Sequence, residues 1–241
     1  MTVIVHPDRA SLVGQTADRL AALLAELTEA QGRATIALTG GSVGIELLAA
    51  LADRAVDWER VHVTWSDERF VPADSPDRNA RQAREALLDR VPIPAGNVHE
   101  LPAAAGPGVG DAGLDDAAAA ASAMLAELGQ IDLTLLGMGP DAHIASLFPG
   151  HPGVHEPGVG VIAVRDSPKP PPERISFTVG AITASDRVWL VVAGGDKAEA
   201  VSLVRGGAAP EAAPAVTAAG RRETLMLLDA EAAALLEEDG R

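Results

Sequence analysis

The stretch from Asp132 to Gly150 reads DLTLLGMGPDAHIASLFPG and indicates the fold of the chain. It begins with a short apolar run, typical of a buried strand, and continues at once into a glycine-rich turn. The turn carries a carboxylate, Asp141, and an imidazole, His143, two residues apart. A parallel α/β sheet presents acid–base groups in this way, at the carboxyl end of a strand. We therefore expect both side chains to lie at the mouth of such a sheet.

The rest of the chain alternates short apolar runs with longer amphipathic stretches, a pattern that favours parallel α/β units. We predict a three-layer α/β fold: a mostly parallel, Rossmann-like sheet with helices on both faces and a small added sub-region. No repeat or linker divides the chain, so we expect a single domain over residues 1–241. Strands are expected at residues 3–5, 35–38, 61–65, 131–136, 161–164, 175–178, 188–192 and 224–228. Helices are expected at residues 9–30, 43–51, 79–88, 111–128, 196–204 and 230–238, with a Pro/Gly/Ala loop at 102–110.

The composition excludes several classes of function. The net charge of -15 repels nucleic acids and anionic membranes, and the aromatic content of 2% argues against a base-stacking surface. The absence of cysteine excludes disulfides, thiol catalysis and thiolate metal sites. No apolar run reaches the roughly 18 residues of a membrane span, and the first residues show no signal-peptide pattern. We expect a cytoplasmic protein without nucleic-acid or membrane partners.

The segment Thr39-Gly40-Gly41-Ser42 joins a predicted strand to a predicted helix. Its glycines allow close approach of a ligand to the backbone, the helix N-terminus offers free N–H groups, and Ser42 adds a hydroxyl. The segment therefore suits a phosphate group. A tight turn capped by Ser42 explains the same residues equally well.

Two further segments supply charge near predicted strands. Asp67-Glu68-Arg69 follows a strand, where Arg69 can hold a phosphate or carboxylate through two hydrogen bonds, or can belong to a surface turn with an internal ion pair. A proline-rich stretch at residues 166–178 holds Lys169 and Arg174 in an extended chain. It can provide cations for phosphate or serve as a rigid connector.

The Asp141–His143 pair is the strongest candidate for acid–base chemistry. A histidine can take a proton from water near neutral pH, and a carboxylate can hold it in one tautomer. A capping aspartate beside an ordinary, partly buried histidine is the alternative. The other histidines lack the spacing of metal ligands, so no metal site is expected.

Taken in order over residues 36–205, these motifs resemble those of the 6-phosphogluconolactonases. The resemblance rests on Thr39-Gly40-Gly41-Ser42, Asp67-Glu68-Arg69, Gly137-Met138-Gly139-Pro140-Asp141-Ala142-His143 with Ser146-Leu147-Phe148-Pro149, Ser167-Pro168-Lys169-Pro170-Pro171 and Gly194-Gly195-Asp196-Lys197-Ala198. It implies an enzyme that hydrolyses 6-phospho-D-glucono-1,5-lactone to 6-phosphogluconate in the pentose phosphate pathway. Such a carboxylic ester hydrolase needs no cofactor and no metal, and its partner is a small sugar-phosphate lactone.

The related glucosamine-6-phosphate deaminases share the fold, and three places separate them from the lactonases. Deaminases place a glutamate five residues after the histidine, where this chain has Phe148, and usually an aromatic residue where it has Arg69. The proline run Pro168–Pro172 also fits the lactonases. The chain also departs from the lactonases, with Ala142 in place of a glycine, Ile144 in place of a threonine and Val43-Gly44 in place of Thr-Pro. If position 142 requires a positive φ, its alanine is strained.

The resemblance also implies roles for individual residues. His143 would remove a proton from the attacking water, Asp141 would orient it, and Arg69 would stabilise the oxyanion or hold sugar hydroxyls. The phosphate would sit on the backbone of Gly40, Gly41 and Ser42, with Arg174 and Lys197 as its cations. Asp67 and Lys169 would be further residues that bind the substrate. A sugar-phosphate deaminase or isomerase, or a non-catalytic sugar-phosphate sensor, remains the alternative, and a monomer is the expected state.

Overall fold

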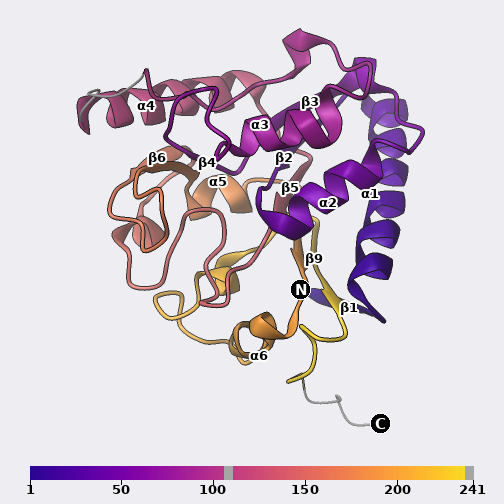
Figure 1. Cartoon of the computed structure of the whole chain (residues 1–241), viewed down its shortest axis with the longest axis vertical. Coiled ribbons are helices and arrows are strands. Elements are labelled where there is room, and N and C mark those ends of the chain that lie inside the picture. The colour runs from indigo at the N-terminus through magenta and orange to yellow at the C-terminus, as the bar shows by residue number, and fades with distance from the viewer. Residues whose placement is uncertain (106–110, 237–241) are drawn as a thin grey trace.

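The computed structural model describes residues 1–105 and 111–236 and contains a six-stranded parallel sheet in the order β1-β9-β8-β5-β2-β3. The predicted α/β fold with a mostly parallel sheet is confirmed (Figure 1). Apolar side chains fill these strands, which are buried between layers, as is typical of parallel sheets. The strands are β1 (Thr2–His6), β2 (Ala34–Leu38), β3 (Val61–Trp65), β5 (Leu133–Leu136), β8 (Arg187–Val192) and β9 (Glu223–Asp229).

A small antiparallel sheet in the order β4-β7-β6 forms the added sub-region. Its strands are β4 (Asp67–Arg69), β6 (Val161–Val164) and β7 (Arg174–Phe177). The sequence did not indicate β4, because its three residues are all charged. The strand exists because it pairs with β7, which places Arg69 opposite Arg174. A pairing between segments over a hundred residues apart leaves no local sequence signal.

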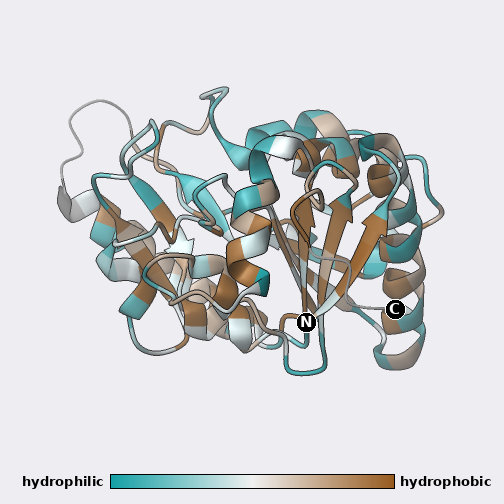
Figure 2. Cartoon of the chain, turned by 90° about the horizontal axis from the view of Figure 1, so that it is seen from below, coloured by the Kyte–Doolittle hydropathy of each residue, from teal (hydrophilic) through white to brown (hydrophobic). Residues whose placement is uncertain are grey.

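Helices cover both sides of the large sheet (Figure 1). Helices α1 and α2 pack on one side, and the small sheet with α4 and α5 lies on the other. Figure 2 shows the apolar strands enclosed between helices whose outer faces are hydrophilic. The helices are α1 (Arg9–Gln31), α2 (Gly41–Leu51), α3 (Asn79–Ala83), α4 (Asp111–Leu128), α5 (Val179–Thr183) and α6 (Ala198–Arg205).

The elements differ from the predicted ones at several ends. The helix expected at residues 79–88 is α3 followed by a π-helical turn over Arg84–Leu88, and α5 was not predicted. Residues 230–236 form turns instead of the expected last helix, and residues 237 and 238 of that helix lie outside the described part of the chain. Residues 106–110 of the expected loop at 102–110 also lie outside it. No helix among the described residues is long and apolar enough to cross a membrane.

The strand order creates a crevice at the carboxyl ends of β2 and β5. The chain continues from β2 to β3 on one side of this pair, whereas β8 lies on the other side of β5. Open α/β sheets bind ligands at such a point, because the loops after the two strands turn away from each other. One hydrogen bond joins the two loops here: the Gly137 backbone N–H donates to Thr39 Oγ1 at 3.1 Å.

The backbone at Ala142 has a φ of 60°, in the left-handed region that favours glycine. Ala142 and Ala17 are equally buried, with no exposed surface, but Ala17 lies in the ordinary helix α1. Replacing either by glycine removes one buried methyl group, and only Ala142→Gly also relieves backbone strain. We expect Ala142→Gly to lower the free energy of unfolding less than Ala17→Gly by about 1–2 kcal/mol.

Urea denaturation of the two variants beside the unsubstituted chain measures this difference. Equal losses in both variants would show that the surrounding structure already accommodates Ala142 without strain.

Candidate active site

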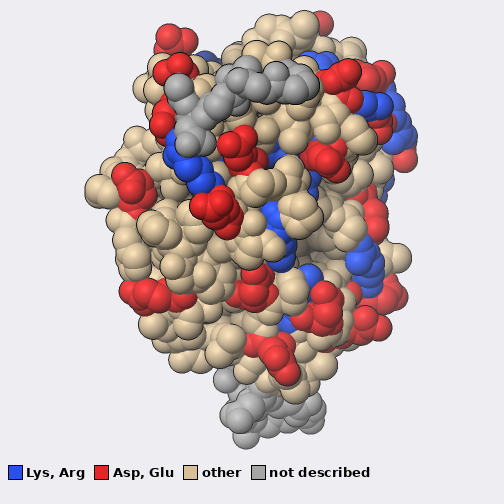
Figure 3. Space-filling model, turned by 60° about the vertical axis from the view of Figure 1, so that its left-hand side comes forward, with Lys and Arg blue, Asp and Glu red and all other residues tan. Residues whose placement is uncertain are grey.

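A cleft of about 330 Å³ opens at the crevice between β2 and β5. The loops after β2 and β5, strand β4, the end of β8 and the proline-rich segment before β7 all contribute to its lining. Figure 3 shows one face of the molecule, on which Lys and Arg side chains gather near a hollow and Asp and Glu side chains surround them. Of the candidate residues, Asp141 alone is absent from the lining, which includes Gly40, Gly41, Ser42, Asp67, Arg69, His143, Lys169, Arg174 and Lys197.

Asp141 and His143 form a hydrogen-bonded pair at the end of β5. The distance from His143 Nδ1 to Asp141 Oδ1 is 2.5 Å. Burial of Asp141 opposes its ionisation, but the hydrogen bond from His143 and the positive charge of Lys169 favour the ionised form, and the pKa of the Asp141 carboxyl lies well below its usual value. The ionised carboxylate accepts a hydrogen bond from Nδ1–H, so in the neutral ring Nε2 is the nitrogen that carries the free lone pair.

Two neighbours hold the His143 ring. The ring of Phe148 packs against it with a centroid distance of 4.6 Å, and Phe148 is itself almost fully buried. The backbone of Gly139 lies directly against the side chains of His143 and Asp141. A Cβ atom added at Gly139 would collide with both of them. Only glycine at position 139 therefore allows the pair to adopt this arrangement.

Lys169 lies beside the acid–base pair. Its Nζ is 3.4 Å from Asp141 Oδ1 and 3.2 Å from His143 Nδ1. Arg174, which is almost fully buried, holds the segment that carries Lys169, because its guanidinium donates to the backbone oxygens of Lys169, Pro170 and Pro171. The predicted cation Arg174 thus lines the cleft and also supports the loop.

The loop after β2 begins helix α2 with glycines. Gly41 has a φ of 81°, and Gly40 occupies the N-cap position without a side chain that could cap the helix. Ser42 Oγ accepts a hydrogen bond of 2.9 Å from Arg9, and Glu46 holds the same guanidinium. An Oγ that accepts from Arg9 keeps its own proton for donation to a ligand.

Lys197 lies at this end of the cleft. Its Nζ forms an ion pair of 2.9 Å with Asp196 Oδ2. The Asp196 charge also acts on Arg9, which bonds to Ser42, so these groups lie near the start of α2. The cleft therefore has one cation, Lys169, next to His143 and another, Lys197, near the glycine loop.

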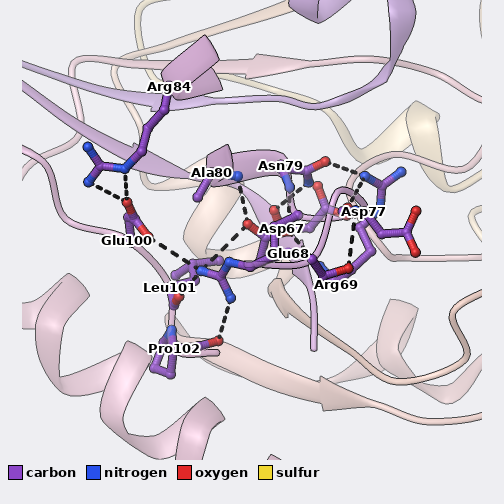
Figure 4. Close-up of polar contacts among 12 residues, drawn as sticks. Asp67, Glu68, Arg69, Asp77, Asn79, Ala80, Arg84, Glu100, Leu101 and Pro102 are labelled. Carbon is purple, nitrogen blue, oxygen red and sulfur yellow. Dashed lines mark hydrogen bonds and ion pairs between the residues drawn. The ribbon is translucent and has the colours of Figure 1, made fainter. Parts of the chain in front are cut away.

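The two acidic residues of β4 have opposite surroundings (Figure 4). Asp67 lines the cleft and accepts a hydrogen bond of 2.7 Å from Ser146 Oγ. Glu68 is fully buried, and its carboxylate accepts the backbone N–H groups of Arg69, Asn79 and Ala80. Burial raises the pKa of Glu68 above its usual value, although these N–H groups and the Arg78 charge favour the ionised form. Glu68 is therefore a structural group that attaches helix α3 to β4.

Comparison with known proteins agrees with the geometry of the site. The family model of glucosamine-6-phosphate isomerases/6-phosphogluconolactonase matches residues 7–227. The chain belongs to this family. It is 47% identical to a 6-phosphogluconolactonase of Mycobacterium leprae over 97% of both chains, and 46% identical to one of Streptomyces coelicolor over 97% of this chain and 94% of the relative.

Solved structures of the family have the same fold. The 6-phosphogluconolactonase of Trypanosoma brucei superposes with a TM-score of 0.87 at 27% identity, covering 98% of each chain. A monomeric glucosamine-6-phosphate deaminase superposes with a TM-score of 0.81 at 19% identity, covering 98% of this chain and all of the other. The fold is thus common to both branches of the family and does not separate them.

Sequence reasoning missed Arg9, Asn79 and Ser146, which contact the candidate residues. Arg9 bonds to Ser42, Asn79 to Arg69, and Ser146 to Asp67. Ser146 was part of a quoted motif, but its spacing gave no reason to connect it with Asp67. Arg9 and Asn79 belong to no motif, and only the packing of distant segments brings Asn79 to the cleft lining and Arg9 to Ser42.

A Gly139→Ala substitution tests the fit of the turn around His143. The added methyl group has to displace the His143 and Asp141 side chains, so we expect kcat to fall about 100-fold while the chain stays folded. Gly14→Ala in helix α1 is the matched control, because nothing lies within 4 Å of its added Cβ. Steady-state kinetics and circular dichroism measure both variants. An unchanged kcat in Gly139→Ala would mean that His143 and Asp141 can act from another arrangement.

Proposed function

We propose that this chain hydrolyses 6-phospho-D-glucono-1,5-lactone to 6-phosphogluconate, the reaction for which its relatives are named. The observation that carries the proposal is the His143–Asp141 pair at the mouth of a cation-lined cleft. The 47% identity to the Mycobacterium leprae 6-phosphogluconolactonase over nearly the whole chain supports it. The substrate is a reactive cyclic ester with one phosphate, so it requires a base for water and cations for its charge.

His143 acts as the general base in this proposal. Nε2 takes a proton from water while the water oxygen bonds to the lactone carbonyl carbon. The tetrahedral intermediate then breaks the bond from this carbon to the ring oxygen, and His143 returns the proton to that oxygen. Throughout the reaction, Asp141 accepts a hydrogen bond from Nδ1–H of His143 and so stabilises the imidazolium that forms.

The cations divide between the two ends of the substrate. Lys169 lies next to His143, where its charge stabilises the negative oxygen that develops on the carbonyl. Arg69 bonds to the Asn79 amide beside Gly40, so it approaches the substrate from the side of the glycine loop and holds its sugar hydroxyls. The phosphate lies on the backbone of Gly40–Ser42 at the start of α2, and Lys197, which lines the same cleft, supplies positive charge for it. Helix N-termini bind phosphate well because their N–H groups are free. Asp67 remains available as an acceptor for sugar hydroxyls.

The alternatives fit the site less well. A deaminase of the glucosamine-6-phosphate type carries a titratable glutamate where this chain has Phe148, and the buried Phe148 ring packs on His143 instead. A sugar-phosphate sensor would not require Gly139 to make room for a preformed His143–Asp141 pair. The monomeric state and the cytoplasmic location stay predictions.

Replacing the base tests the proposal directly. We expect His143→Ala to fold and to lower kcat by about 10²–10⁴, since this is the usual contribution of one general base. The assay follows lactone disappearance above its spontaneous hydrolysis. His155→Ala, at an exposed histidine outside the cleft lining, is the control. Lactone hydrolysis at the wild-type rate in His143→Ala would remove His143 from the mechanism, and release of ammonia from glucosamine 6-phosphate would favour a deaminase.

The two lysines should separate in their kinetic effects. We expect Lys169→Met to lower kcat about 100-fold, because it removes charge from the developing oxyanion. We expect Lys197→Met to raise KM about 10- to 100-fold with a smaller change in kcat, because it weakens phosphate binding in ground and transition states alike. Both variants keep an unbranched side chain of similar length. If Lys169→Met instead raised KM and Lys197→Met lowered kcat, the phosphate would lie at the His143 end of the cleft.

A further inference from the structure

We propose that Asn79 is a positioning residue that fixes the guanidinium of Arg69 in the cleft. The proposal rests on the proposed function to the extent that Arg69 acts on the lactone substrate. Neither the sequence motifs nor the family resemblance pointed to Asn79, whose contacts come from the folded chain.

The side-chain amide of Asn79 bridges two parts of β4 (Figure 4). Its Oδ1 accepts a hydrogen bond of 2.6 Å from Arg69 Nη1, and its Nδ2 donates one of 2.9 Å to the backbone oxygen of Asp67. Asn79 is 2% exposed, so water does not compete effectively for these bonds. One amide thus fixes the strand backbone and the guanidinium relative to each other.

Asn79 also sets the distance between β4 and the glycine loop. A Cβ atom at Gly40 would collide with the Asn79 amide, so the absence of a side chain at position 40 lets the amide lie against the loop. The amide therefore occupies the place where the proposed phosphate end of the cleft meets the strand that carries Arg69. Little space is left for the amide to turn.

Asn79 is itself held from the side away from the cleft. Its backbone N–H donates to Glu68 Oε1 at 2.7 Å, and Arg78 lies 3.9 Å from the other carboxylate oxygen of Glu68. Arg78 is almost fully buried and donates to the backbone oxygen of Leu101 at 2.8 Å. The buried Glu68–Arg78 group therefore fixes Asn79 before any ligand enters.

Arg69 depends on these contacts for its direction. Nη1 has two acceptors, Asn79 Oδ1 and the backbone oxygen of Asp77, whereas the buried Nε has no hydrogen-bond partner among the described residues. Without the Asn79 acceptor, a single exposed contact to Asp77 would orient the guanidinium. A preorganised cation stabilises a transition state better than a mobile one, because it needs no reorientation during the reaction.

A double-mutant cycle between Asn79→Ala and Arg69→Ala tests the proposal. We expect Asn79→Ala to lower kcat about 10- to 100-fold in the wild-type chain, as for loss of a hydrogen bond to a charged group. In the Arg69→Ala chain we expect the same substitution to change kcat less than about twofold, since no guanidinium remains to be positioned. The melting temperature should fall in both backgrounds, because the bond to Asp67 is lost in each.

Asn97→Ala is the matched control, since its Nδ2 donates to the backbone oxygen of Glu59 and it does not line the cleft. It should leave kcat unchanged. If Asn79→Ala does not fold, Asn79→Ser enters the same cycle.

Equal losses of kcat from Asn79→Ala in both backgrounds would overturn the proposal and leave Asn79 a purely structural residue. The cycle is also measured on the dissociation constant of 6-phosphogluconate by calorimetry. If the wild-type chain binds 6-phosphogluconate but hydrolyses no lactone, the proposed function fails. The role of Asn79 is then still decided by whether Asn79→Ala weakens binding of this acid more in the wild-type chain than in the Arg69→Ala chain.

Discussion

The parallel pairing of β2 with β5 is the constraint on which the site depends. Because β3 continues on one side of this pair and β8 on the other, the loops that leave β2 and β5 diverge and open a crevice. One loop begins α2 and offers backbone N–H groups, and the other carries the His143–Asp141 pair. The hydrogen bond between Gly137 and Thr39 holds the two loops together at their base. Binding groups and acid–base groups thus meet through strand order alone.

Charged groups around the cleft divide into those that build it and those that face a ligand. Glu68 and Arg78 are buried and bound to each other and to backbone groups, so they fix α3 against β4. Arg174 supports the loop of Lys169 through backbone oxygens. Among the residues that the structure describes, Lys169 and Lys197 each pair with one carboxylate, that of Asp141 and that of Asp196. The chain carries a net charge of -15, and its cleft is nevertheless lined by cations, because buried charged groups hold the segments that present them: Glu68 holds the segment of Arg69, and Arg174 holds that of Lys169.

Local patterns in the sequence predicted most strands and helices, because apolar periodicity and glycine turns act over a few residues. Strand β4 escaped prediction, since its three charged residues form a strand only by pairing with β7. Ala142 was predicted to be strained if its φ were positive, and it has a φ of 60°. Arg9 and Asn79 gave no signal, because their partners are more than a few residues away and no motif spacing connects them.

The sequence by itself determined the reactive elements: an acid–base pair two residues apart, a glycine turn before a helix, and Phe148 in the place of a titratable group. These follow from residue type and short spacing, which the backbone preserves in any fold of this class. The tertiary structure alone decided which cation lies beside His143, that Glu68 faces the interior while Asp67 faces the cleft, and that Asn79 holds Arg69. Such relations depend on long-range packing, whose energy is spread over many contacts and leaves no pattern in neighbouring residues.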